Sequence, residues 1–80
     1  MVTKYVIICD STKNKNQILY LVDRNFVKDK WWSEYLNDAF FFEKIESAKF
    51  SLKNLKYNNP RIAEVKEESK ERDRLPIGVL

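Results

Sequence analysis

Two short apolar runs separated by a polar segment predict a β-hairpin near the start of the chain. The first run covers residues 4–10 and places apolar side chains on both of its faces, which is typical of a strand covered on both sides. The second run covers residues 18–23. The seven-residue connection between them, residues 11–17, contains no glycine, so we predict an antiparallel hairpin with an open loop rather than a tight turn.

Apolar residues at helical spacing predict one helix over residues 44–57. Four of them fall at i, i+3, i+7 and i+10, on one face of a 3.6-residue repeat: Ile45, Ala48, Leu52 and Leu55. Acidic residues lie near the expected N-terminal end and lysines near the C-terminal end, as the helix dipole favours. Residues 58–60 read Asn-Asn-Pro, which ends the helix because proline cannot continue it.

Shorter elements are predicted on either side of this helix. Ser33 stands where it would cap a single helical turn over residues 34–37. Residues 39–42, Ala-Phe-Phe-Phe, predict a short and very apolar strand, and residues 61–66 predict a last strand. The fold class we predict is therefore α+β, a small antiparallel sheet in ββ-turn-βαβ order that a single helix covers on one face.

These elements make one predicted domain over residues 4–66, followed by a charged C-terminal tail over residues 67–80. Residues 67–74 carry seven charges of both signs in eight positions, which is typical of a solvated helix extension or a disordered tail. Residues 75–80 are mostly apolar. Two interpretations of them stay open: they pack back on the body, or they form a loose terminus.

Composition predicts a cytoplasmic protein without a membrane span. The chain is 44% hydrophobic and 34% charged, and it lacks the run of about 18 apolar residues that would predict a transmembrane helix. The apolar stretch at the N-terminus is too short for a signal peptide. Cys9 is the only cysteine, so no intrachain disulfide can form, and a lone thiol in an apolar strand is most often a small buried side chain.

The residue types present argue against most enzyme classes. The chain has no histidine, which removes the commonest general base and the commonest metal ligand. Its single glycine, Gly78, leaves no glycine-rich phosphate loop. The aspartates do not follow a calcium-loop pattern, and Cys9 has no histidine to activate it. We predict a protein that is not an enzyme, with no catalytic residues, no metal and no cofactor.

Seven of the eleven aromatic residues lie between positions 26 and 42. Neighbours in an extended segment point to opposite sides, so Trp31 and Trp32 cannot share a face, and Phe41 cannot share the face of Phe40 and Phe42. One interpretation assigns every ring to the core. The other, equally open, keeps Trp32, Phe40 and Phe42 in the core and predicts a surface that binds a protein partner, formed by Trp31, Tyr35, Phe41, Lys49 and Lys53.

The charge distribution supports two alternative kinds of partner. The net charge is +3, and residues 1–63 hold 11 basic and 7 acidic side chains, a mildly basic surface that permits contact with nucleic acid or an acidic protein. No recognised nucleic-acid-binding motif occurs. The alternative to a protein-binding function is a small nucleic-acid binder that uses Lys13, Lys15, Lys49, Lys53 and Lys56. A homodimer joined through the aromatic surface is a further possibility.

The segment 32–48 resembles a loose pattern in small, mostly uncharacterised accessory proteins of bacteriophages and mobile elements. In that pattern a hairpin precedes a tryptophan, a short turn, Ala-x-x-Phe and a helix with an alanine six positions after the phenylalanine. The matching positions are Trp32, Ala39, Phe42 and Ala48. The resemblance covers residues 4–66 and departs at Lys44, where such proteins often carry a serine or threonine cap. It implies a phage protein that binds and inhibits a bacterial host protein, such as a defence nuclease, in the host cytoplasm.

Overall fold

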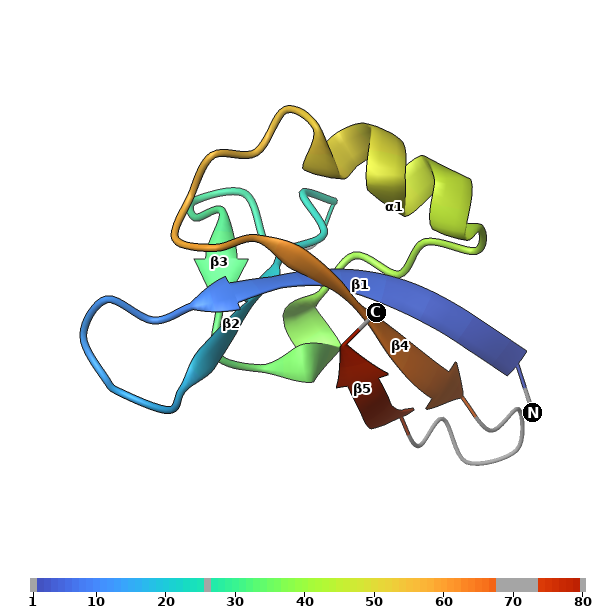
Figure 1. The fold of residues 1–80 in the computed structure, drawn as a ribbon, viewed down its shortest axis with the longest axis horizontal. Coiled ribbons are helices and arrows are strands. Elements are labelled where there is room, and N and C mark those ends of the chain that lie inside the picture. Colours follow the sequence, from blue (N-terminus) through green and yellow to red (C-terminus); the bar gives the residue numbers. More distant parts are fainter. Residues whose placement is uncertain (1, 26, 68–73, 80) are drawn as a thin grey trace.

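The computed structural model describes residues 2–25, 27–67 and 74–79, and it has an α+β fold with a small antiparallel sheet, as predicted (Figure 1). The sheet contains β1 (Val2–Asp10), β2 (Ile18–Leu21), β3 (Trp32–Ser33), β4 (Arg61–Glu67) and β5 (Arg74–Val79). They lie in the order β3-β2-β1-β4-β5. A short 3₁₀ helix, η1 (Leu36–Asp38), and one α-helix, α1 (Ile45–Leu52), come between β3 and β4 in the chain.

β1 is the central strand, and it is buried on both faces, as its apolar sequence predicts. Val6, Ile7, Ile8 and Cys9 each expose 1% or less of their surface. β2 and β4 pair with its two edges, both antiparallel. The alternation of side chains along a strand then sends neighbours into different clusters, with Ile7 on the side of α1 and both Val6 and Ile8 on the opposite side.

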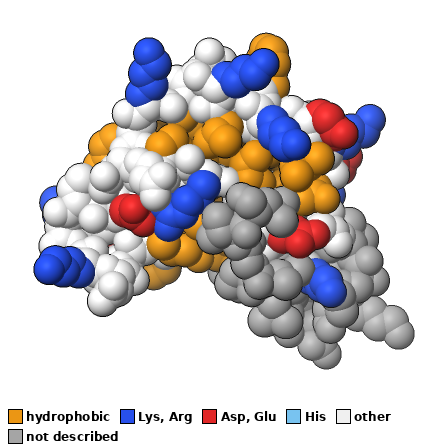
Figure 2. Space-filling view, viewed as in Figure 1, with side chains coloured by type: hydrophobic (Ala, Val, Ile, Leu, Met, Phe, Trp, Pro, Cys, Tyr) orange, Lys and Arg blue, Asp and Glu red, His pale blue; other side chains and the backbone are white. Residues whose placement is uncertain are grey.

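α1 lies over β1 and β4 on one face of the sheet (Figure 1). The cluster beneath it contains four buried residues: Ile7, Phe42, Ala48 and Ile62. Ala48 is fully buried, and its small side chain lets the helix approach the strands closely. Figure 2 shows hydrophobic side chains gathered along the junction between the helix and the sheet, with Lys and Arg side chains around them.

The opposite face of the sheet also carries a core. Its buried residues are Val6, Ile8, Tyr20, Ala39, Ala63 and Val65. Leu36 of η1 and the ring of Phe41 pack against this cluster. β4 supplies both faces, because Ile62 belongs to the cluster under α1 while Ala63 and Val65 belong to the opposite one. The two-sided core explains why apolar residues of β4 do not alternate strictly.

The prediction of a continuous strand over residues 39–42 is wrong, because the structure has two isolated β-bridges there. Ala39 bridges Val22 and Phe42 bridges Tyr5, both antiparallel. β1 and β2 are themselves antiparallel. A segment that runs antiparallel to both must turn between its two bridges, so it cannot be one straight strand. Phe42 and Tyr5 exchange two backbone hydrogen bonds of 2.8 and 2.9 Å, which tie the segment to the start of β1.

The helical turn predicted over residues 34–37 is observed as η1, at Leu36–Asp38, and Ser33 supports it differently from the cap we expected. The Ser33 hydroxyl accepts a hydrogen bond from the Tyr35 backbone N–H at 3.1 Å and donates one to the Asp38 carboxylate at 2.7 Å. The side chain is almost fully buried. Ser33 therefore ties both ends of the turn to β3.

The helix predicted over residues 44–57 is shorter, because α1 ends at Leu52. The backbone N–H groups of Asn54 and Leu55 donate to carbonyls three residues back instead of four, which tightens the last turn. The chain then leaves the helix axis, and the carbonyl of Asn58 accepts a 3.0 Å hydrogen bond from the backbone N–H of Asp10 at the end of β1. This long-range contact explains why the helix stops before its apolar pattern does.

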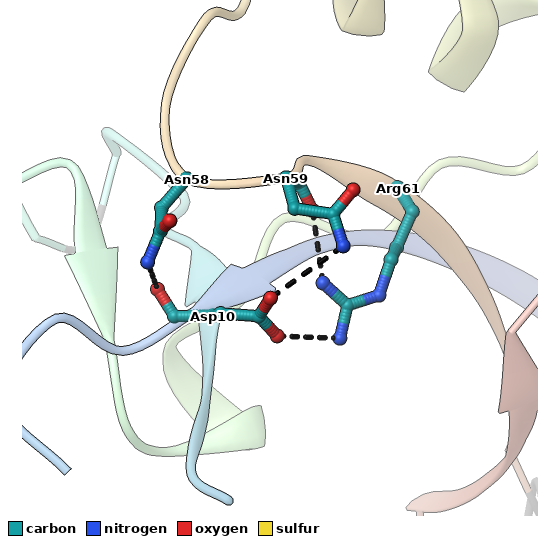
Figure 3. A network of polar contacts seen from close by, with 4 residues as sticks. All are labelled: Asp10, Asn58, Asn59 and Arg61. Atoms are coloured by element: carbon teal, nitrogen blue, oxygen red, sulfur yellow. Dashed lines mark hydrogen bonds and ion pairs between the residues drawn. The ribbon is translucent and has the colours of Figure 1, made fainter. Parts of the chain in front are cut away.

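The loop between α1 and β4 is fastened to Asp10 by a polar network (Figure 3). The Arg61 guanidinium lies 2.9 Å from the Asp10 carboxylate and donates a 2.8 Å hydrogen bond to the Asn59 carbonyl. The Asn58 side chain donates to the Asp10 carbonyl at 2.8 Å, and the Asn59 side chain lies 3.5 Å from the carboxylate. Asn59 has a φ of 59°, a left-handed conformation that asparagine tolerates.

Of the two interpretations left open for the C-terminal segment, the structure supports packing on the body. β5 pairs antiparallel with β4, with an irregularity between Glu64 and Val65. Residues 68–73, which hold five of the seven charges of residues 67–74 in the predicted tail, lie outside the described residues. Within the described part, no helix has the length and hydrophobicity needed to cross a bilayer.

Candidate functional site

One exposed aromatic surface runs between α1 and the segment that precedes β3. Phe50 and Trp31 expose 70% and 60% of their surfaces, and Phe40 between them exposes 36%. Two hollows adjoin there, and both are lined by Phe40, Phe42 and Ser51. We call this continuous surface the aromatic groove, and its main lining residues are Leu21, Trp31, Phe40, Phe42, Phe50 and Ser51.

Trp31 is held in place although its ring is exposed. Its carbonyl accepts a 3.0 Å hydrogen bond from the Val22 N–H, which fixes the backbone beside β2. The Arg24 guanidinium carbon lies 4.7 Å from the centroid of the Trp31 ring, in a cation–π arrangement. Arg24 also donates a 2.7 Å hydrogen bond to the Lys30 carbonyl. These contacts hold the indole at the rim of the groove.

The three consecutive phenylalanines alternate as predicted, but their exposure differs from what we expected. The rings of Phe40 and Phe42 lie 4.6 Å apart between centroids, on the side of α1. Phe42 is buried, whereas Phe40, which we expected in the core, is exposed. Phe41, which one of the two open interpretations placed on the surface, packs half-buried against the opposite cluster. The reason is that both faces of the sheet carry a core.

Phe50 is the groove residue that the sequence analysis missed. It stands two positions after Ala48, about 200° around the helix from the buried face. Its ring therefore projects away from the core, and it is the most exposed large hydrophobic residue described. The sequence does contain a signal for it, because a phenylalanine outside the apolar face of a predicted amphipathic helix needs another partner to cover it.

A second surface, separate from the groove, lies between the hairpin loop and β3. It is a hollow whose lining includes Lys13, Lys30, Trp32, Glu34, Tyr35 and Tyr57. We call it the lysine–tyrosine hollow. The rings of Trp32 and Tyr57 stack there with centroids 5.5 Å apart and planes inclined by 23°. Among the residues that the structure describes, none lines both this hollow and the aromatic groove.

The structure does not bring the predicted partner-binding residues together. Trp31 lies in the aromatic groove and Tyr35 in the lysine–tyrosine hollow. Phe41 forms part of the groove wall but packs against the core. Lys49 and Lys53 are exposed. Neither is among the described residues that line the aromatic groove, and Lys53 lies just after the end of α1.

The lysines predicted for nucleic-acid binding fall into two groups. Lys13 and Lys15 are exposed on the hairpin loop, as the sequence predicts. Only Lys49 of the other three belongs to α1, because the helix ends at Leu52 and both Lys53 and Lys56 follow it. The three lysines that we expected on the predicted helix are therefore reduced to one within α1.

Burial changes the pKa of two side chains in the core. Burial, assisted by the neighbouring Asp10 carboxylate, raises the pKa of the Cys9 thiol to about 11, so the thiol stays protonated at neutral pH. Burial also raises the pKa of the Tyr20 hydroxyl. Among the described residues, Cys, Asp and Glu side chains form no group of three that could hold a metal ion.

Comparisons with protein-family models, with curated proteins and with solved structures found no significant match to this chain. The resemblance of residues 32–48 to phage accessory proteins therefore stays a prediction. Function has to be argued from the two surfaces themselves.

Proposed function

We propose that this chain is a small protein, not an enzyme, that binds another protein through the aromatic groove. One observation carries the proposal: Trp31 and Phe50 expose 60% and 70% of their surfaces on adjoining hollows that share Phe40. A continuous exposed apolar patch on a small domain is typical of an interaction surface. Large rings such as tryptophan contribute most of the binding free energy at interfaces.

The surroundings of the groove resemble the polar rim of an interface. Arg24 and Asp23 border the end near Trp31, and Glu43, Lys44 and Glu46 border the end near the helix. Protein interfaces combine an apolar centre with such a mixed, solvated rim. Rim charges of both signs favour a protein partner over a uniformly anionic polymer, because each acidic side chain would repel phosphate groups.

Pre-ordering of Trp31 also favours binding. The Arg24 guanidinium on the indole and the backbone hydrogen bond to Val22 restrict the side chain before any partner arrives. Ordering a flexible side chain costs about 0.5–1.5 kcal/mol on association, and a ring already held in place avoids most of that cost.

The experiment is affinity capture from a bacterial lysate with matched variants. The Trp31→Ala/Phe50→Ala double variant removes the two exposed rings, while Tyr35→Ala removes an equally exposed ring (66%) from the other surface. We expect the double variant to lose the captured protein and Tyr35→Ala to retain it. Circular dichroism confirms that each variant is folded. Equal capture by the double variant and the wild type would refute the proposal.

The narrower proposal, a phage-encoded inhibitor of a host defence protein, is supported only by the resemblance at Trp32, Ala39, Phe42 and Ala48. It is tested by producing the chain in bacteria that carry a defence system and measuring phage plaque numbers. We expect plaque numbers to recover with the wild-type chain and not with the groove double variant. Plaque numbers that never change across a panel of defence systems would contradict it.

A further inference from the structure

The lysine–tyrosine hollow combines unpaired lysines with exposed tyrosine rings. Lys13 and Lys30 bring two positive charges to it, and Glu34 is the only acidic residue among its described lining residues. Among the described residues, neither lysine ammonium group has an ion-pair or hydrogen-bond partner. The hollow therefore presents unpaired positive charge to solvent. An anionic ligand would form new ion pairs with these lysines without breaking existing ones.

The aromatic groups of the hollow are arranged as a platform. Tyr35 exposes 66% of its surface, and Tyr57 exposes 39% while it stacks on Trp32. Because Trp32 stacks on one face of the Tyr57 ring, the other face stays available to stack with a ligand ring. Bases of a single strand bind such faces, because every base has a π-surface.

The hairpin loop holds Lys13 close to this platform. The Ser11 hydroxyl accepts hydrogen bonds of 3.2 Å from the backbone N–H groups of Lys13 and Asn14. The Ser11 N–H donates a 3.0 Å hydrogen bond to the Gln17 carbonyl, and Asn16 adopts a left-handed conformation with a φ of 68°. The loop is thus internally bonded, and the lysine projects from a defined position.

We propose that the lysine–tyrosine hollow binds single-stranded nucleic acid, with bases on Tyr35 and Tyr57 and phosphates on Lys13 and Lys30. A single strand alternates flat apolar groups with anionic groups, and the hollow offers partners for both. A duplex fits less well, because its bases are already stacked inside the helix. The site is independent of the groove and differs from the helix lysines that the sequence suggested.

The experiment measures fluorescence anisotropy of a labelled oligothymidine of about 12 nucleotides, a length that covers a typical single-strand site. The full chain is titrated at about 50 mM and about 200 mM salt, because release of counterions weakens phosphate contacts as salt rises. We expect Tyr35→Ala to weaken binding about 5- to 150-fold, the range for loss of one stacked base. The matched control is Trp31→Ala, an equally exposed ring of the groove, which should bind as the wild type does.

Variants that remove lysine charges distinguish binding at this hollow from binding at the lysines of α1 and the residues after it. The Lys13→Gln/Lys30→Gln double variant should weaken binding and reduce the slope of log affinity against log salt by about 0.7 for each lysine removed. The Lys49→Gln/Lys53→Gln double variant should leave both quantities unchanged. In a Trp31→Phe background Trp32 is the only tryptophan, and its emission should change as the oligonucleotide saturates.

Four results of these titrations would overturn the proposal. They are an absence of salt-dependent binding, unchanged affinity in Tyr35→Ala, loss of binding in the helix lysine variant, and unchanged Trp32 emission at saturation. A phosphotyrosine peptide that binds more tightly than the oligonucleotide would also overturn it, in favour of a peptide ligand. Because the groove variants leave the hollow intact, failure here is distinguishable from failure of the proposed protein-binding function.

Discussion

Burial changes the acid–base properties of single residues in this chain, and Cys9 is the clearest case. The thiol is fully buried in β1. Its pKa rises to about 11 because burial disfavours the charged thiolate. A protonated and inaccessible thiol is a small hydrophobic side chain, so the sequence-based interpretation of Cys9 as a buried residue is confirmed.

The raised pKa of Cys9 predicts how stability depends on pH. The unfolded chain loses the thiol proton near pH 9.0 while the folded chain keeps it until about pH 11. Stability from this group is complete below pH 9 and is lost as the pH rises toward 11. Denaturant unfolding at a series of pH values should show a decline that is shallower in Cys9→Ala. The Tyr20 hydroxyl, with a pKa raised in the same direction, accounts for part of the remaining decline. An identical decline in both proteins would contradict the prediction.

The hydrogen bonds of Ser33 lead to a second prediction for a single residue, a loss of stability when its hydroxyl is removed. Its buried hydroxyl bonds the Tyr35 N–H and the Asp38 carboxylate. Ser33→Ala leaves both groups without this partner, so we expect a loss of about 1–3 kcal/mol in the free energy of unfolding. Urea denaturation measures it, with Ser47→Ala on the exposed side of α1 as the control. A Ser33→Ala variant as stable as that control would show that the turn does not depend on the hydroxyl.

At the scale of elements, the sequence predicted the helices and strands that are determined by interactions between residues close together in the chain. The hairpin is observed at β1 and β2, and the amphipathic helix at α1, because side-chain period and turn residues specify them. The break in residues 39–42 was not predictable, since it arises from pairing with Val22 and Tyr5, both far away in the chain. The early end of α1 has the same kind of cause, a contact between Asn58 and Asp10.

The start of α1 predicts a stabilising substitution. Lys44 occupies the N-cap position with extended backbone angles (φ −123°, ψ 139°), and its side chain makes no capping hydrogen bond. A serine there would accept a hydrogen bond from a free backbone N–H of the first turn. We expect Lys44→Ser to raise the free energy of unfolding by about 0.5–2 kcal/mol. Lys44→Ala is the matched control, and equal stability of the two variants would contradict the prediction.

For the whole molecule, the main result is that the aromatic residues divide among a core and two surfaces. One of the two interpretations that the sequence left open placed Trp31 and Tyr35 on the surface, and both are exposed. It could not show that they lie on separate surfaces, because their positions depend on how β3 and η1 pack against β2. It also assigned Phe41 rather than Phe40 to the surface, because a second core on the face opposite α1 is a property of the complete sheet.

The groove also predicts the behaviour of the free protein in solution. Sedimentation velocity at rising concentration should give a monomer, because the proposed partner of the groove is a different protein. A dimer that disappears in Trp31→Ala/Phe50→Ala would instead assign the groove to a second copy of the chain. A dimer unaffected by those substitutions would mean that other residues join the two copies.

The claim that the aromatic groove is a protein-binding surface is tested most directly at Phe50, the groove residue contributed by α1. Quantitative capture compares Phe50→Ala with Tyr35→Ala, two single substitutions of equally exposed rings. A hot-spot residue contributes about 2 kcal/mol or more, so Phe50→Ala should lower the affinity for the captured protein about 30-fold. Tyr35→Ala should bind as tightly as the wild type. Undiminished binding by Phe50→Ala, with loss of binding in Tyr35→Ala, would contradict the claim.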